Sequence, residues 1–289
     1  MWGYLLPAVH AIREIQSRTR DAADDEYVFV SCGPVMDVKT EELARLLGVR
    51  HSIVQDERHA AGPETIVVTV ARWDIFLSQY APYVGLPWGR AVARILRDVV
   101  AHRSVPPFIR SSRATIRAIV QVRDAVLRLL PTAEPSSSRR DASCYCLLKR
   151  SAQPEYYAPG VGQAKNPTYG TGRRSLVGLD AAASALSQPS HRVAVFEPGI
   201  HTLPDQIRTF RDCRGVIAIR GAELANIAWL DTGSKVIVIN AGTFRLSAPP
   251  ARGLAHLLGL RYLEIDWGHD PYPELTSDLV ERIRRLIDS

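Results

Sequence analysis

The chain has 289 residues, of which 46% are hydrophobic, so it is long enough for two domains of ordinary size or one large domain. This composition excludes a globally disordered chain. The formal net charge of +6 favours an acidic ligand, an anionic membrane surface or nucleic acid as a partner, without choosing among them.

The first part of the chain alternates predicted helices and strands. Trp2–Ser17 has apolar residues at helical spacing, and Thr40–Leu47 is predicted to be a helix that ends at Gly48. Runs rich in β-branched and aromatic residues predict strands at Glu26–Ser31, Ser52–Val54 and Thr65–Val70. This alternation indicates a Rossmann-like half.

The sequence gives no sign of a targeting or membrane-spanning segment. Met1–Pro7 is apolar but too short for a secretory signal, and no run reaches the roughly 20 apolar residues that a spanning helix needs. The cysteines are interpreted as buried thiols in a reducing compartment rather than as metal ligands; they are Cys32, Cys144, Cys146 and Cys213. We therefore expect a cytoplasmic protein.

Ala91–Leu130 is predicted to be mainly helical, with an interruption at Pro106-Pro107. The part from residue 103 to residue 128 is markedly basic, with arginines at Arg103, Arg110, Arg113, Arg117, Arg123 and Arg128. A solvated helix face is the first interpretation, and peripheral contact with an anionic membrane or a charged acceptor is the second. No aromatic stacking platform accompanies the arginines, which counts against single-stranded nucleic acid.

Pro131–Ser143 is the clearest break in composition, because it is rich in Pro, Ser and charge and nearly lacks apolar residues. It is predicted to be a linker between domains. Cys144–Leu148 is then predicted to be a buried strand that runs directly into Lys149 and Arg150. Gln153–Gly172 is loop-like and long, and such loops are commonly functional.

The stretch from His191 to Asn240 organises the second half. Apolar runs predict strands at Arg192–Phe196, Val216–Ile219 and Lys235–Asn240, and helical patterns between them begin at Leu203 and Leu224. Strand, helix, strand, helix, strand with short connections is the pattern of a parallel sheet with right-handed crossovers.

The turn at Gly221 is the candidate ligand site of this sheet, because ligands of open α/β sheets collect beyond the carboxyl ends of strands. Gly221 allows the backbone to approach a ligand, the following helix offers free N–H groups, and Arg220 adds a permanent positive charge. These features suit a phosphate. The competing interpretation is a small-residue turn where helix and strand pack tightly.

The same stretch contains a helix with spaced apolar residues and a glutamine, then the Gly-Ala turn, then a Gly-Ser turn before a strand. The residues concerned are Leu203, Gln206, Ile207 and Phe210, Gly221-Ala222, Leu224-Ala225-Asn226, Gly233-Ser234 and Val236-Ile237. In this order they resemble the signature of glycosyltransferase family 61. Two residues depart from it, since Arg220 replaces the family's His and Glu223 replaces its second Gly. An arginine can hold a diphosphate, whereas Glu223 would repel one unless it points away or bonds a sugar hydroxyl.

The resemblance covers the second half of the chain, from Tyr145 onward. Lys149-Arg150 and Arg173-Arg174-Ser175-Leu176 resemble the family's basic elements after the first strand of this half. Arg252–Asp266 resembles its closing helix and strand, and Ser277–Ile287 is predicted to be an amphipathic terminal helix.

The resemblance implies an α/β fold of the GT-B type, with two Rossmann-like domains whose parallel sheets face each other across a cleft. Residues 1–130 would form the acceptor-side domain, 131–143 the linker and 144–289 the nucleotide-sugar-binding domain. Glu197 would accept hydrogen bonds from the ribose hydroxyls. The full expected donor site comprises Lys149, Arg150, Arg173, Glu197, Arg220, Gly221, Ala222, Glu223 and Asn226.

The implied activity is inverting, metal-independent transfer of a sugar from a nucleotide-sugar, foremost a UDP-sugar, to a hydroxyl of a glycan or polysaccharide. Basic side chains would neutralise the diphosphate, and the sequence has no Asp-x-Asp element, so no metal or other cofactor is expected. The N-terminal half would supply the general base. His10 and Asp37 are its candidates, with a surface imidazole and a helix cap as their alternatives.

Three other classes of function compete with this one. A non-catalytic glycan- or nucleotide-binding protein that keeps the fold is supported by Glu223 and by the absence of the family's N-terminal His near Tyr4. A dinucleotide-dependent oxidoreductase is disfavoured, because no G-x-G-x-x-G follows a predicted strand. Nucleic-acid binding rests on charge alone and is not expected.

Overall fold

A computed structural model describes the chain in several segments. These are residues 9, 12, 13 and 16, then 25–31, 34–56, 58, 123–128, 143–152, 171–172, 174–240, 250–268 and 270–289. The predicted strand Thr65–Val70, most of Ala91–Leu130 and the linker up to residue 142 lie outside the described residues. Among the helices that these segments contain, none is long and apolar enough to cross a lipid bilayer.

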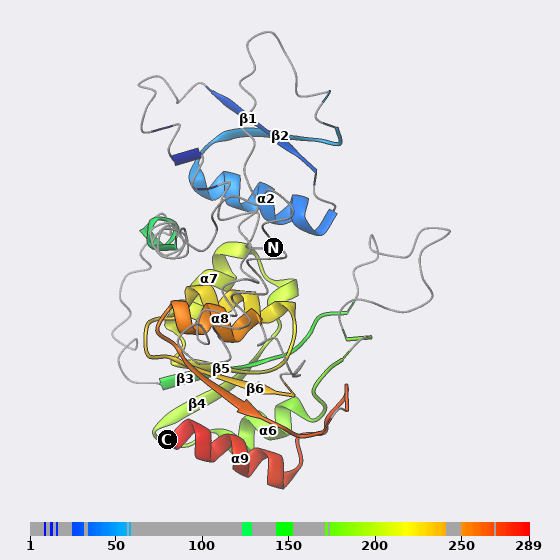
Figure 1. The fold of residues 1–289 in the computed structure, drawn as a ribbon, viewed down its shortest axis with the longest axis vertical. Coiled ribbons are helices and arrows are strands. Elements are labelled where there is room, and N and C mark those ends of the chain that lie inside the picture. The colour runs from blue at the N-terminus through cyan, green and yellow to red at the C-terminus, as the bar shows by residue number, and fades with distance from the viewer. Residues whose placement is uncertain are drawn as a thin grey trace, which may run out of the picture.

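The second half forms a five-stranded sheet in which every pair of neighbours is parallel (Figure 1). The order across the sheet is β4-β3-β5-β6-β7. The strands are β3 (Ser143–Leu148), β4 (His191–Phe196), β5 (Gly215–Ile219), β6 (Lys235–Ile239) and β7 (Arg261–Ile265). All residues of β5 and β6 are buried, as expected of central strands covered on both faces.

Helices cover both faces of this sheet. The helices α7 (Leu203–Asp212) and α8 (Pro250–Leu257) lie above it in Figure 1, and α6 (Leu179–Leu186) and α9 (Ser277–Asp288) lie below it. The 3-10 helix η6 (Ala222–Trp229) packs against α7 and α8. Because successive side chains of a strand point to opposite faces, Val216 and Val236 join one core while Ile217 and Ile237 join the other.

Local sequence signals explain how the elements of this half begin and end. Thr202 caps α7 by accepting a hydrogen bond from the backbone N–H of Asp205, and Pro204 occupies the first turn. Each predicted strand and α7 are found within one or two residues of their expected bounds. The helix expected from Leu224 is instead a 3-10 helix that begins at Ala222. The predicted α/β class with a parallel sheet is confirmed.

The strand order places a topological switch point between β3 and β5. From β3 the chain moves to β4 at one edge of the sheet, and from β4 it passes back over β3 to β5. The remaining strands, β6 and β7, continue in that second direction. In doubly wound sheets of this order, the loops that follow the two central strands diverge and leave a crevice for a ligand.

A smaller parallel unit precedes this sheet. It consists of β1 (Glu26–Val30), the helix α2 (Pro34–Leu47) and β2 (Arg50–Val54). Gly48 ends α2 with a φ of 66°, and hydrogen bonds from Gly48 N to Arg45 O and from Val49 N to Ala44 O complete a Schellman motif. The helix begins at Pro34, six residues before the predicted Thr40. Proline is compatible with the first turn of a helix, and Pro34 has this role here.

The helix α2 of the smaller unit packs against α7 of the larger one. Oε2 of Glu42 accepts a hydrogen bond from the free backbone N–H of Leu203 at 2.7 Å, and Nζ of Lys39 donates to the backbone oxygen of His201 at 3.3 Å. Leu43 joins the core that lies between α7 and the sheet. The N-terminal unit is therefore attached at the start of α7, next to the loop that follows β4.

Candidate functional site

Three loops meet at the carboxyl edge of the five-stranded sheet. They follow β3 (Lys149–Ser151), β4 (Glu197–His201) and β5 (Arg220–Gly221). Because the strands are parallel, all three loops leave the same edge, and β3 lies between β4 and β5. Most of the predicted donor-site residues therefore lie on loops that the fold brings together.

A buried ion pair joins the loop after β3 to η6. Nε of Arg150 lies 3.0 Å from Oε1 of Glu223, and Arg150 is only 7% exposed. Nη1 of Arg150 and Oε2 of Glu223 are also buried, and neither has a hydrogen-bond partner among the described residues. Buried polar atoms are nearly always paired, so this arrangement lacks partners that a ligand or another group would supply.

Gly221 stands directly beside this ion pair. A Cβ on Gly221 would lie 2.4 Å from Oε2 of Glu223 and 3.3 Å from Cζ of Arg150. Its φ of −178° is extended backbone that any residue adopts, so the requirement for glycine comes from space and not from conformation. The Arg150–Glu223 pair occupies the space beside Gly221, and the predicted close approach of the Gly221 backbone to a ligand stays a prediction.

The position of Glu223 decides one of the two sequence-based alternatives. It does not point away from the basic residues, because its Oε1 pairs with Arg150, whereas its Oε2 has no partner among the described residues and a bond to a sugar hydroxyl stays a prediction. Its negative charge is therefore compensated within the protein. The sequence does not indicate this pairing, because Arg150 and Glu223 are 73 positions apart in the chain.

Two other predicted basic residues, Lys149 and Arg220, lie on the loops that follow β3 and β5. Nζ of Lys149 forms an ion pair with Oε2 of Glu197 at 2.8 Å, and that carboxylate raises the pKa of the lysine. Glu197 is therefore engaged before any ribose is present. Arg220 is exposed, and its backbone oxygen accepts a hydrogen bond from Nη1 of Arg174 at 3.2 Å. Arg173 lies outside the described residues.

Asn226 lies behind the Gly221 turn and is 2% exposed. Its Nδ2 donates to Oε1 of Gln206 at 3.1 Å, while its Oδ1 is buried without a partner among the described residues. Gln206 belongs to the family pattern but is not among the site residues that the sequence predicts. The signal for it in the sequence is a glutamine among the apolar residues of an amphipathic helix, because an amide on that face needs polar partners.

A family model described as Glycosyltransferase 61 matches residues 76–237, which is more than half of the chain. The matched range contains β3, β4, β5 and the three loops of the switch point. The chain belongs to glycosyltransferase family 61. Membership implies glycosyl transfer from a donor to an acceptor, so the protein is a glycosyltransferase. No curated protein sequence matches the chain significantly.

The extent of the family match differs from the predicted resemblance. The match begins well before Tyr145, at residue 76, and ends within β6, so it does not include α8 and β7. The recognition of the family from the Gly221 turn and the α7 pattern is confirmed. The predicted likeness of Arg252–Asp266 to the closing helix and strand lies outside the matched residues.

Of the two candidate general bases of the glycosyltransferase, the structure describes Asp37 but not His10. His10 lies outside the described residues. Asp37 lies within the first turn of α2 and accepts a hydrogen bond from Oγ of Ser31 at 2.6 Å. The alternative of a cap just before a helix is therefore wrong in detail, because α2 has already begun at Pro34. A catalytic role for either residue stays a prediction.

Two cysteines of the glycosyltransferase that are far apart in the sequence, Cys146 and Cys213, lie next to each other in the structure. Sγ of Cys146 lies 2.7 Å from Sγ of Cys213, and both residues are buried and free, as predicted. Cys144 is only partly buried, and the neighbouring thiols of Cys146 and Cys213 lower its pKa below the ordinary value. Within the described segments, no group of three or more His, Cys, Asp or Glu side chains is placed to hold a metal ion.

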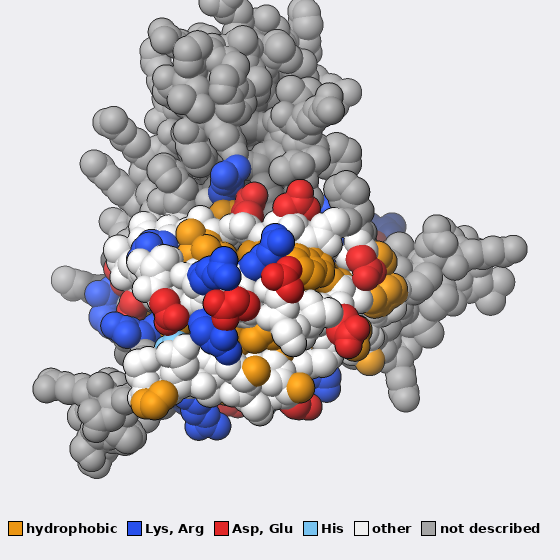
Figure 2. Space-filling model, turned by 90° about the horizontal axis from the view of Figure 1, so that it is seen from below, with side chains coloured by type: hydrophobic (Ala, Val, Ile, Leu, Met, Phe, Trp, Pro, Cys, Tyr) orange, Lys and Arg blue, Asp and Glu red, His pale blue; other side chains and the backbone are white. Residues whose placement is uncertain are grey.

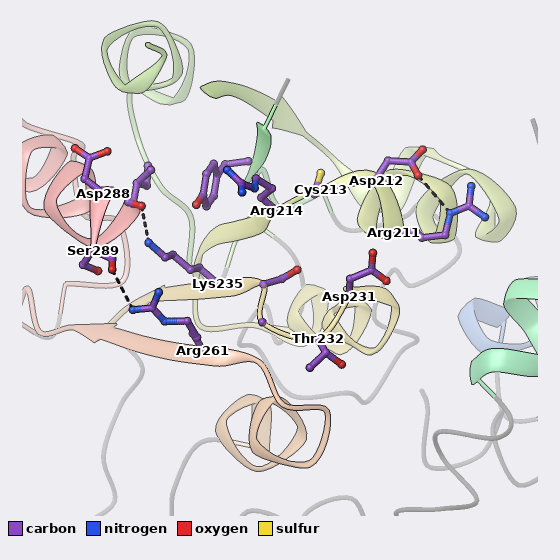
Figure 3. A pocket seen from close by; sticks show the side chains of 14 residues that line it. Arg211, Asp212, Cys213, Arg214, Asp231, Thr232, Lys235, Arg261, Asp288 and Ser289 are labelled. Carbon is purple, nitrogen blue, oxygen red and sulfur yellow. Dashed lines mark hydrogen bonds and ion pairs between the residues drawn. The ribbon is translucent and has the colours of Figure 1, made fainter. Parts of the chain in front are cut away.

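A pocket of about 820 Å³ lies at the opposite, amino edge of the sheet (Figure 3). Arg214, Lys235 and Arg261 line it at the starts of β5, β6 and β7, together with the end of α9. None of the predicted donor-site residues lines this pocket. Nζ of Lys235 donates to the backbone oxygens of Leu286, at 3.1 Å, and Ile287, at 2.5 Å. The lysine therefore caps the C-terminal end of α9.

Lys235→Met should destabilise the glycosyltransferase by about 1–2 kcal/mol, because two helix-terminal carbonyls lose their donor. Burial, with the positive charge of Arg261, lowers the pKa of Lys235 below the ordinary value of 10.5. As the pH rises toward 10.5, the folded state releases this proton before the unfolded state does, so the stabilisation by Lys235 grows. Urea unfolding should show that the difference in unfolding free energy between wild type and variant is larger at about pH 10 than at about pH 7. These two pH values lie near and well below the ordinary pKa of a lysine. A smaller difference in unfolding free energy at high pH would show that the pKa of Lys235 is not lowered in the folded state.

The face of the glycosyltransferase on which α9 lies mixes charges of both signs (Figure 2). Glu281 pairs with Arg284 and Arg285, and Asp278 pairs with Arg282, along α9. A face of this kind does not favour an anionic membrane surface. The membrane contact predicted for residues 103–128 falls outside the described residues except for 123–128.

Proposed function

We propose that the glycosyltransferase uses a nucleotide-sugar donor and binds its diphosphate at the switch point between β3 and β5. The observation that carries this proposal is the buried guanidinium of Arg150, whose Nη1 lacks an acceptor among the described residues. Its position beyond the carboxyl ends of the two central strands is where doubly wound sheets bind ligands.

Arg150 suits a diphosphate because of how its donors are divided. Its Nε is engaged by Glu223, and this bond fixes the plane of the guanidinium. A guanidinium has five N–H donors, so others remain for phosphate oxygens. We infer that Glu223 orients Arg150, and that a phosphate oxygen is the partner that Nη1 lacks.

Further cations of the carboxyl edge would complete the charge balance. Arg220 is exposed at the end of β5, and Lys149 at the end of β3 is half exposed despite its pairing with Glu197. We keep the prediction that these side chains, with Arg173, neutralise the departing nucleoside diphosphate without a metal ion. Glu197 would exchange Lys149 for ribose hydroxyls when the donor binds.

The remaining features of the mechanism are proposed from the resemblance. The N-terminal half would bind the glycan or polysaccharide acceptor in a GT-B arrangement, and His10 or Asp37 would deprotonate its hydroxyl for inverting transfer. Attachment of α2 beside the loop after β4 brings the N-terminal unit close to the carboxyl edge, which supports an acceptor there. We propose a cytoplasmic location.

A binding protein without turnover is the second candidate. The observation that favours it is the same ion pair, because a guanidinium already neutralised by Glu223 gives less stabilisation to the negative charge that develops on a departing diphosphate. In this case a nucleotide-sugar would bind and be released unchanged.

Release of free nucleoside diphosphate from a panel of UDP- and GDP-sugars, with a mixed glycan acceptor, tests the proposed function. We expect wild type to release the diphosphate from at least one donor and Arg150→Met to do so at a rate lower by about 100-fold. Arg192→Met, an exposed arginine at the start of β4, is the matched control and should keep the wild-type rate. Binding of a donor without release would favour the second candidate, and absence of binding would refute both.

A further inference from the structure

A buried amide on α7 holds the loop that follows β4 at two points. Gln206 is 3% exposed. Its Nε2 donates hydrogen bonds to the backbone oxygens of Pro198, at 2.7 Å, and His201, at 2.9 Å. Pro198 is the first residue of the 3-10 helix η5 (Pro198–Ile200), and His201 is the residue directly after it. One nitrogen therefore fixes the position of the whole turn.

The other end of the same amide reaches the element after β5. Oε1 of Gln206 accepts a hydrogen bond from Nδ2 of Asn226 at 3.1 Å. Asn226 belongs to η6, which begins directly after Gly221. Gln206 thus joins the loops of two strands, β4 and β5, that are separated in the sheet by β3.

The loop after β3 also contacts both of these elements, the η5 turn and η6. Gly199 lies against Ser151 so closely that a Cβ would stand 2.1 Å from its Oγ. The next residue toward the strand, Arg150, pairs with Glu223 of η6. A closed ring of contacts, hereafter the loop ring, therefore runs through Gln206, the η5 turn, Ser151, Arg150, Glu223 and η6 back to Gln206.

We propose that Gln206 is a positioning residue, which keeps Arg150 and the Gly221 turn at the separation that a diphosphate needs by closing the loop ring. The ligand named here rests on the proposed function, whereas the ring rests on contacts alone. A glutamine that only satisfied its own helix would bond to carbonyls of α7. Gln206 instead donates to the loop after β4 and accepts from η6.

Hydrogen exchange at individual backbone amides tests the loop ring without a ligand. Gln206→Met has a similar length but cannot form these bonds. It should speed exchange at His201, in the η5 turn, and at Leu224, in η6, whose N–H groups bond to Pro198 O and Gly221 O. The amide of Cys213 at the far end of α7, bonded to Phe210 O, should keep its wild-type rate.

Two further variants separate positioning from a general loosening of α7. In its ionised form, at a pH above the pKa of the new carboxyl group, Gln206→Glu can still accept from Asn226 but cannot donate to Pro198 and His201, so only His201 should exchange faster. Ile207→Val trims the neighbouring buried residue of the same helix, and it should leave His201 and Leu224 unchanged. Unchanged exchange at Leu224 in Gln206→Met, or faster exchange at both amides in Ile207→Val, would overturn the proposal.

A double-mutant cycle with UDP as the probe tests the effect on the site. In the wild-type background, Gln206→Met should raise the Kd of UDP about tenfold, as measured by calorimetry. In the Arg150→Met/Glu223→Gln background, the same substitution should raise it less than about twofold. Equal effects in both backgrounds would show that Gln206 acts independently of Arg150 and would overturn its role. If the exchange results hold but wild type binds neither UDP nor GDP, the proposed function fails while the loop ring stands.

Discussion

Arg150→Met is expected to lower the free energy of unfolding by about 3–5 kcal/mol, because the carboxylate of Glu223 is left buried without its counter-charge. The Kd of UDP should rise by about 10- to 100-fold, since a charge-assisted hydrogen bond to a phosphate is worth about 1.5–3 kcal/mol. Arg150 and Glu223 are both largely buried, so water replaces little of the lost interaction. Urea unfolding and calorimetry measure the two effects.

The double variant Arg150→Met/Glu223→Gln separates stability from binding. It removes both charges while keeping similar side-chain volumes, and replacing both partners of a buried pair is often nearly neutral. We expect its stability to return to within about 1 kcal/mol of wild type while its affinity for UDP stays low. A double variant that binds UDP as wild type does would show that Arg150 is not the phosphate anchor.

Gly221→Ala is expected to weaken UDP binding by about tenfold or more, although its backbone conformation suits alanine. The new Cβ would lie 2.4 Å from Oε2 of Glu223, at the end of a flexible side chain that can swing away. Steric cost is therefore small, but movement of Glu223 breaks its pair with Arg150 and releases the guanidinium from its fixed plane. Calorimetry with UDP measures the loss.

Truncation of Glu223 provides the control for this substitution. A Glu223→Ala background removes the shortest contact of the new Cβ and leaves the approach of 3.3 Å to Cζ of Arg150. Adding Gly221→Ala there should therefore change the stability by less than about 0.5 kcal/mol and leave the remaining affinity for UDP unaltered. If Gly221→Ala is as harmful in that background as in wild type, the methyl group acts on the backbone and not through Glu223.

The parallel sheet could be predicted from sequence because its strands carry strong local signals. Val216–Ile219 and Lys235–Asn240 are continuous apolar runs bounded by glycine or polar turns, which indicates strands buried on both faces. Leu203 and Pro204 follow a threonine that caps the helix. These signals lie within ten residues of each element, so a single sequence contains them.

The partners within the site could not be predicted, because they join residues far apart in the chain. Arg150 and Glu223 were both expected at the donor site, but their pairing depends on β3 lying next to β5. Gln206 was visible only as a motif residue, since its two carbonyl partners are backbone atoms that no side-chain pattern marks. The proximity of Cys146 and Cys213 likewise requires the sheet register.

The start of α2 was missed for a local reason. Pro34 follows Cys32-Gly33, and a glycine with a proline predicts a turn that delays the helix to Thr40. Proline is equally compatible with the first turn of a helix, which is the role found. This difference places Asp37 inside the helix and weakens its case as a residue of an open loop.

The most direct test is a crystal structure of the glycosyltransferase soaked with UDP. We expect both phosphates at the carboxyl edge between β3 and β5, with a phosphate oxygen bonded to Nη1 of Arg150 and the Arg150–Glu223 pair still in place. Phosphates bound instead in the pocket at the amino edge, beside Arg214 and Arg261, would contradict it.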